Sequence, residues 1–209
     1  MPKKKQNVDP YELVETGDVS SIATLLDSGF DVNTQGSKML MRTLLAYAVE
    51  VGRVKTVEFL IAQGSDVNIG DLDDATPLHF ASRAANVKLA SLLLDAGADV
   101  HCQDVGGMNA LHHLASGFDC HPSGCETANI LLLHGADVDA VENAGRSALY
   151  FAASLGNHRL ASFLIKQGAN VSLRAGGTQG TALEAAMRTN CKKSIGALKA
   201  GASLSLIHM

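Results

Sequence analysis

The residues best suited to chemistry gather in one short segment near the middle of the chain. Cys120, His121 and Cys125 lie close together, and His112 and His113 precede them. Tetrahedral zinc takes thiolate and imidazole ligands of these kinds. The C-x4-C spacing is looser than a C-x2-C knuckle, however, and the segment offers one cysteine pair. Three interpretations stay open, which are a zinc site, an oxidised Cys120–Cys125 pair and ordinary loop thiols, and the sequence favours the last.

Catalysis is not expected elsewhere in the chain. A nucleophile needs a positioned base and a group that orients that base. The chain contains no G-x-S-x-G, Walker, H-E-x-x-H or dinucleotide-binding motif. The glycine-rich stretch 176–180 is not followed by the lysine of a phosphate-binding loop, so a hairpin is the expected structure there. We therefore predict that the protein is not an enzyme and uses neither a cofactor nor a bound metal.

The element that organises the chain is a recurring glycine after an apolar run. Its spacings are 35, 33, 38, 33 and 33 residues, and the positions are Gly29, Gly64, Gly97, Gly135, Gly168 and Gly201. A period near 33 indicates stacked repeats, each too small to bury its own apolar face. Helix C-termini favour glycine in the left-handed conformation, so we expect these glycines to follow the second helix of each repeat.

The best-preserved repeat carries the residues Thr76-Pro77-Leu78-His79-Phe80-Ala81, and this T-P-L-H-x-A motif resembles the ankyrin repeat family. The resemblance implies an all-α solenoid of helix-turn-helix units with protruding β-hairpin loops and a concave groove. It also implies that the motif histidines, His79 and His112, hydrogen-bond backbone as structural residues. Thr76 is expected to cap its helix and Pro77 to open the first turn.

The repeats divide nearly the whole chain. Residues 1–7 are expected to form a disordered basic tail, and 8–209 the repeat domain, with units at 8–38, 39–71, 72–104, 105–142, 143–175 and 176–209. The first unit and the shorter, more polar final helix are expected to be caps, since end repeats need a solvated outer face. The five surplus residues of the fourth unit lie between its helices, where Pro122 and glycines predict a loop.

Charge and composition narrow the possible partners. The net charge is −4, which argues against nucleic acid. No apolar run is long enough to span a bilayer, and the N-terminus lacks the apolar core of a signal peptide. Four cysteines form no dense disulfide framework. We expect a monomeric cytoplasmic protein, with the nucleus as an alternative if the lysines at 3–5 act as a targeting signal.

A second set of residues repeats in register on the first helices. Tyr47, Phe80, His113 and Phe151 are spaced 33, 33 and 38 residues apart, so they hold one slot in successive repeats. In ankyrin proteins this slot faces the groove. Two interpretations stay open, because the rings either contact a partner or pack on one another and stiffen the solenoid. Binding energy concentrates in aromatic and arginine residues, and the remaining candidates are Arg42, Arg83, Met108, Phe118, Arg146 and Arg188.

These patterns predict a non-catalytic scaffold or adaptor that binds another protein in the groove and at the hairpin tips. Two alternatives come from other classes. One is a metal-binding or enzymatic role centred on the Cys/His segment of the fourth repeat. The other is nucleic-acid or nucleotide binding in the groove, which the acidic residues Asp71, Asp73 and Asp74 disfavour.

Overall fold

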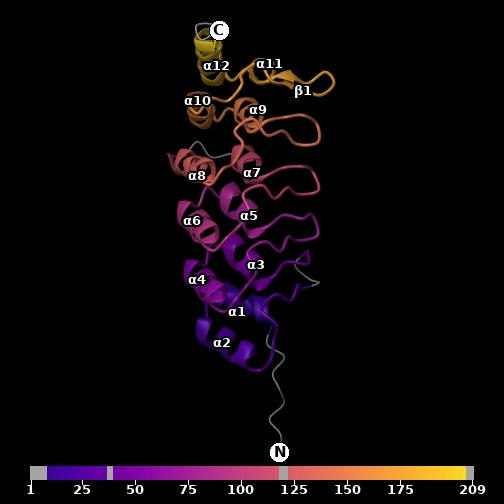
Figure 1. Cartoon of the computed structure of the whole chain (residues 1–209), viewed down its shortest axis with the longest axis vertical. Coiled ribbons are helices and arrows are strands. Elements are labelled where there is room, and N and C mark those ends of the chain that lie inside the picture. Colours follow the sequence, from indigo (N-terminus) through magenta and orange to yellow (C-terminus); the bar gives the residue numbers. More distant parts are fainter. Residues whose placement is uncertain (1–8, 37–39, 118–121, 206–209) are drawn as a thin grey trace, which may run out of the picture.

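The computed structural model describes residues 9–36, 40–117 and 122–205, with side chains described as far as residue 202. In these residues, helix pairs stack along one axis into an elongated column (Figure 1). The predicted tail at 1–7 and the candidate Phe118 lie outside the described residues.

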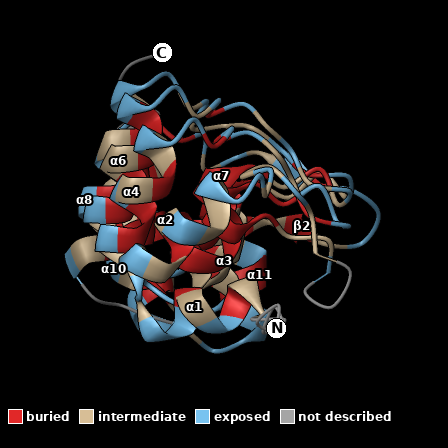
Figure 2. Cartoon of the chain, turned by 90° about the horizontal axis from the view of Figure 1, so that it is seen from below, coloured by how far each residue is buried: buried red, intermediate tan, exposed pale blue. Residues whose placement is uncertain are grey.

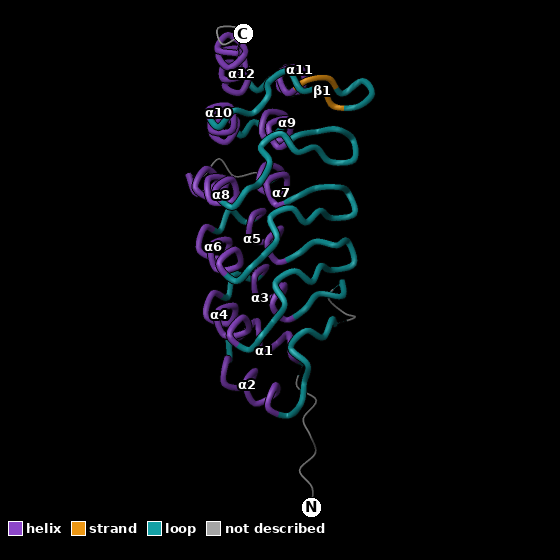
Figure 3. Tube along the Cα trace, in the orientation of Figure 1, coloured by secondary structure: helices purple, strands orange, loops and turns teal. Residues whose placement is uncertain are grey.

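Two layers of helices run the length of the column, and a row of hairpins projects beside them (Figures 1 and 3). The first helix of each pair forms the inner layer, beside the hairpins: α1 Pro10–Thr16, α3 Leu44–Glu50, α5 Pro77–Arg83, α7 Ala110–Ser116, α9 Ala148–Ser154 and α11 Ala182–Arg188. The second helix forms the outer layer: α2 Val19–Asp27, α4 Val54–Ala62, α6 Val87–Asp95, α8 Pro122–Leu133, α10 His158–Lys166 and α12 Lys192–Ser205. The predicted helical repeat architecture is therefore confirmed.

Local signals set the helix boundaries as the sequence indicates. Asp9 accepts a hydrogen bond from the backbone N–H of Tyr11 at 3.0 Å, and Pro10 opens α1. Thr76 precedes α5, and its backbone N–H donates to His79 Nδ1 at 2.9 Å, which satisfies an N-terminal donor. After the outer helices, Gly64, Gly97, Gly135 and Gly168 have φ between 83° and 93°, the left-handed conformation expected of them.

The core lies between the two helical layers (Figure 2). Leu78 and Ala81 of α5 are 1% and 0% exposed, which confirms that they face inward. The equivalent leucines Leu111 and Leu149 are also buried. Small alanines at 81, 115 and 152 keep the inner helices thin, so that successive repeats approach closely.

The hairpins are joined by backbone hydrogen bonds from one repeat to the next. Val105 N–H donates to Asp73 O at 2.9 Å, Asn143 N–H to Gly106 O at 3.0 Å, and Gly176 N–H to Ala144 O at 2.7 Å. In the described residues, regular β-structure consists of the antiparallel pair β1 Arg174–Ala175 and β2 Gly180–Thr181, with isolated bridges in two other hairpins. This agrees with protruding hairpins in place of a sheet core.

Two predictions about the outer helices are wrong. Pro122 and Gly124 are not in a loop, because α8 begins at Pro122; proline lacks the N–H that a first helical residue would leave unpaired. The final helix is not shorter than its counterparts, since α12 has 14 residues and continues through Gly201. A Cβ at Gly201 would lie 2.8 Å from Ile165 Cγ2, so this glycine permits close packing of α12 on α10.

Candidate functional site

The candidate binding residues lie mainly on the inner helices and on the hairpin arms beside them. We call this surface the inner face. Its members are Arg42, Tyr47, Phe80, Arg83, Met108, His113, Arg146, Phe151 and Arg188. The structure groups most of them into two clusters, around Phe80 and around Phe151.

The first cluster holds an aromatic ring between two guanidinium groups. Arg42 lies 4.6 Å and Arg83 lies 5.8 Å from the centroid of Phe80, within the range of cation–π attraction. Glu50 pairs with Arg42 and approaches Arg83 to 3.8 Å. Arg42 also reaches Asp71 of the next hairpin at 3.2 Å. The cluster therefore ties an inner helix to the following hairpin.

Exposure differs sharply within this cluster. Phe80 is 6% exposed, and the Arg42 side chain is 13% exposed. The Arg83 side chain is 54% exposed. Arg83 is therefore the exposed cation of this cluster, whereas Phe80 is buried beside it.

The second cluster repeats the same chemistry two repeats further on. Arg146 lies 4.7 Å from the centroid of Phe151, and Tyr150 and His112 contact the ring edge-to-face. Arg188 donates to Tyr150 Oη at 3.0 Å and to Gln179 O at 2.5 Å, which joins the sixth repeat to the fifth. Arg146 and Phe151 are thus in contact, and Arg188 is linked to Phe151 through Tyr150.

A buried carboxylate fixes Arg146. Glu142 accepts hydrogen bonds from the backbone N–H and the Nε of Arg146, both at 3.0 Å. Burial tends to raise the pKa of Glu142, but the hydrogen bonds from Arg146 outweigh it and hold the pKa below its ordinary value. The same hydrogen bond raises the pKa of Arg146. This pair is charged and oriented whether or not a partner is bound.

The two remaining ring positions are occupied by contacts within the chain. Tyr47 is 7% exposed, packs edge-to-face on Tyr11 and hydrogen-bonds Glu15. That hydrogen bond, together with burial, raises the pKa of Tyr47 to about 12. His113 binds Asp104 Oδ2 through Nε2 at 2.8 Å. Both rings therefore pack within the chain, but on residues outside the slot, Tyr11 and His79, and not on one another as the packing interpretation predicts.

The motif histidines have the structural role implied by the family resemblance. Nε2 of His79 lies 3.1 Å from Met108 O, and Nε2 of His112 lies 3.1 Å from Arg146 O, each in the following hairpin. Met108 is half-buried and takes part through its carbonyl. Burial lowers the pKa of His79 to about 4, so the ring is neutral at pH 7. A neutral ring can join the backbone of Thr76 to that of Met108, one through each nitrogen.

Sequence reasoning overlooked the hairpin acids that orient Arg42, His113 and Arg146. Asp71, Asp104 and Glu142 are spaced 33 and 38 residues apart and hold one slot in the hairpins. Asp71 Oδ1 accepts backbone N–H groups of its own hairpin, and Asp104 Oδ1 does the same. Their second oxygens meet Arg42 and His113. The register itself could have revealed this set.

The Cys/His segment is described in part. Cys120 and His121 lie outside the described residues. Cys125 is a free thiol in the first turn of α8, and Cys102 and Cys191 are also free. Among the described residues no group of three or more His, Cys, Asp or Glu is arranged to hold a metal ion. No helix in that part of the chain is long and apolar enough to cross a membrane.

Fold and contacts together define a helical solenoid-repeat protein whose units are joined by histidine–backbone bridges and hairpin hydrogen bonds. A family model described as ankyrin repeats (3 copies) matches residues 12–104, 45–142 and 111–206, so the chain belongs to the ankyrin repeat family. It is similar to a putative ankyrin repeat protein of fowlpox virus, FPV244, at 37% identity over 70 residues. That match covers 34% of this chain and 10% of the viral protein.

Proposed function

We propose that the chain is a non-catalytic scaffold that binds one partner protein across its inner face. Ankyrin repeats are generally protein–protein interaction modules, and the chain belongs to that family. The observation that supports this particular surface is the Phe80 cluster, where the exposed Arg83 stands over a ring held in place by Arg42 and Glu50.

Preorganisation of Arg83 favours binding at the Phe80 cluster. A guanidinium that is already placed by an aromatic ring and a carboxylate loses less side-chain freedom on binding. Arginine and aromatic residues are also the commonest anchors at protein interfaces. Arg83 and Arg188 are exposed, and they present donors for carboxylates or backbone carbonyls of a partner. The hairpin tips beside them add exposed Leu72 and Val105, at 62% and 61% exposure.

The experiment begins with affinity capture and mass spectrometry to obtain a partner. The affinity of that partner is then measured for Arg83→Ala and for the control Lys88→Ala. Lys88 is an equally exposed cation on the outer helix α6, with its side chain 63% exposed. We expect Arg83→Ala to weaken binding about tenfold or more, the effect of an interface anchor, and Lys88→Ala to leave it unchanged.

Both variants remove exposed side chains, so both are expected to fold. Phe80→Ala is a poorer probe because it opens a cavity in a buried site. If Arg83→Ala and Arg188→Ala bind the captured partner as tightly as the unaltered chain does, the inner face is not the binding site.

A further inference from the structure

A pair of adjoining cavities lies on the other side of the molecule, between outer helices. The first, about 450 Å³, is lined by Pro122, Cys125, Arg159, Ser162, Phe163 and Lys166. The second, about 470 Å³, is lined by Val87, Cys125, Glu126, Asn129, Ile130 and Phe163. Because the two share Cys125 and Phe163, we treat them as one depression and call it the outer pocket.

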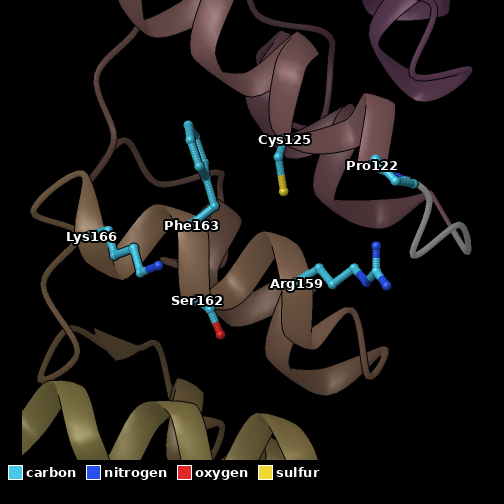
Figure 4. Close-up of a pocket in the computed structure, with 6 residues that line it drawn as sticks. All are labelled: Pro122, Cys125, Arg159, Ser162, Phe163 and Lys166. Atoms are coloured by element: carbon cyan, nitrogen blue, oxygen red, sulfur yellow. The ribbon is translucent and has the colours of Figure 1, made fainter.

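The surplus residues of the fourth repeat help to build this pocket. Helix α8 has 12 residues, whereas its neighbours α6 and α10 have nine each. Its added first turn carries Pro122 and Cys125, which form the wall opposite α10. Figure 4 shows the Cys125 sulfur and the Phe163 ring directed into the space between these helices.

The floor of the outer pocket is apolar and accessible. Phe163 and Ile130 are partly buried against the core and line the depression. Leu133, one turn further along the same face of α8 from Asn129 and Ile130, is 76% exposed. Leu133 thus extends the apolar lining of the depression, and a continuous apolar patch, rather than a single exposed residue, marks a candidate interaction surface.

Two basic residues stand at the rim of the outer pocket. Arg159 and Lys166 are both exposed and stand at the two ends of α10 in Figure 4. In the described part of the chain neither lies within ion-pair distance of a carboxylate, although the net charge of the protein is −4. Ser162 donates to His158 O at 2.7 Å. Two unpaired cations therefore frame an apolar floor.

We propose that the outer pocket binds an acidic segment of a partner protein that carries a large apolar side chain between two carboxylates. The apolar side chain rests on Phe163, Cys125 and Ile130, and the carboxylates meet Arg159 and Lys166. This site is separate from the inner face and does not depend on the function proposed for it.

Helix geometry sets the expected spacing of the partner's acids. Arg159 and Lys166 are seven residues apart on α10, which corresponds to about 10 Å along the helix axis. Alternate side chains of an extended chain lie on one face, so two acids that flank an apolar residue on the pocket side are four residues apart, about 13 Å. The long, exposed side chains of Arg159 and Lys166 can spread to cover the difference of about 3 Å. The motif that fits is acid–x–apolar–x–acid in an extended segment. An anionic membrane surface would also meet the cations, but it has no such spacing.

The test is selection of a displayed random-peptide library on the intact protein, followed by affinity measurement on Arg159→Glu with Lys166→Glu. Both cations are exposed, so the double variant is expected to fold, and circular dichroism checks this. We expect the selected peptides to carry two acids four residues apart, with a Leu, Ile, Met or Phe midway between them. Charge reversal should weaken their binding about tenfold or more, and Arg83→Ala should leave it unchanged.

Cys125 provides a direct report on where the peptide binds. In a variant with the other cysteines replaced by serine, a selected peptide at ten times its Kd should slow alkylation of Cys125 about tenfold by occupying the pocket. Because burial raises the pKa of Cys125, the reaction is run at mildly alkaline pH.

Several results would overturn the proposal. They are selected peptides without acidic residues, binding that survives charge reversal, binding lost on Arg83→Ala, or unprotected Cys125. The protein could instead sediment with vesicles of phosphatidylcholine and phosphatidylserine and lose this binding on charge reversal, while the peptide selection yields no acidic motif. Those results together would assign the cations to a lipid surface. None of these results decides whether the inner face binds its own partner.

Discussion

At the scale of single residues, the motif histidines combine two tasks that require them to stay neutral. His79 accepts the backbone N–H of Thr76 through Nδ1 at 2.9 Å and bridges to Met108 O through Nε2. A protonated ring could not accept at Nδ1. The neutral ring therefore caps one helix and holds the next hairpin at once.

This requirement predicts a dependence of stability on pH. Burial lowers the pKa of His79 from 6.5 to about 4 in the folded chain. Below pH 6.5 the unfolded state therefore binds a proton that the folded state refuses, so the free energy of unfolding should fall as the pH drops toward 4. The cost approaches roughly 3 kcal/mol at the acidic end. The free energy of unfolding, measured by urea denaturation across this range, should fall less steeply in His79→Gln than in the unaltered chain.

Glutamine keeps an acceptor for the capping position, so the variant is expected to fold. His112, whose pKa burial also lowers, leaves some acid sensitivity in it. Parallel pH profiles for the two proteins would contradict the role assigned to His79.

The ring slot shows where residue patterns stop being informative. The spacing of Tyr47, Phe80, His113 and Phe151 places them in one register, but spacing cannot say whether a ring meets solvent or its neighbour. At Tyr47 that depends on Tyr11 and Glu15, which lie on α1 of the degenerate first repeat and belong to no repeated position.

At the scale of elements, glycines with different places in the helix pattern should respond oppositely to the same substitution. Gly97 has φ of 90° and ends an outer helix, whereas Gly196 lies inside α12, where an added Cβ would have no atom within 4 Å. Alanine at 97 should lower the free energy of unfolding by about 1 kcal/mol, because a side chain strains this conformation. Alanine at 196 should raise it by about 0.5–1 kcal/mol through helix propensity. Thermal unfolding of both variants measures the contrast, and shifts of the same sign would contradict it.

The repeats are also linked by side chains at the base of the hairpins. Asn68 Oδ1 accepts the N–H of Asp99 at 2.8 Å, as Asn33 does for Asp66 and Asp139 for Asn170. His101 holds the equivalent place in the next repeat, and in the described residues no such bond joins it to Asp137. Asn68→Ala should therefore cost about 1 kcal/mol of stability.

His101→Ala is the matched control for this bond. Its side chain makes no equivalent link in the part of the chain that the structure describes, so chemical denaturation should show a change near zero, the usual result for a surface substitution. Equal losses in the two variants would show that the asparagine bond adds nothing.

The predicted helix boundaries are wrong at two residues whose type is compatible with two structures. Proline ends helices, so a loop is predicted at Pro122, yet proline is equally suited to the first position of a helix. Gly201 reads as a helix end by its spacing, but it lies inside α12, where the missing side chain leaves room for Ile165 and Val171. The residue type alone decided neither case, whereas the repeat period and the caps at Asp9 and Thr76 were predictable from local sequence.

At the scale of the whole molecule, the position of a core substitution along the column should determine which repeats lose stability. Leu93 of α6 and Leu198 of α12 are 0% and 1% exposed. Leu93→Ala should cost about 2–5 kcal/mol and weaken repeats on both sides, because each unit is supported by its neighbours. Leu198→Ala should speed hydrogen exchange of the backbone amides in the last repeat and leave the amides of the central repeats protected. Hydrogen exchange resolved by segment measures both patterns, and uniform loss of protection in Leu198→Ala would contradict this view.

The backbone bonds between successive hairpins also give the column an unequal stiffness. Along that edge, directional bonds of 2.7–3.0 Å fix the separation of neighbouring repeats. Along the outer helices, the exposed ion pair of Lys88 with Glu58 joins α6 to α4. Between α8 and α10 the lining is mostly apolar, with Phe163 and Ile130, and such contacts are non-directional and tolerate sliding. The molecule should therefore flex like a strip with one reinforced border, opening and closing chiefly on the side that carries the outer pocket. A load along its long axis would widen the gap between α8 and α10 before it parted the hairpins.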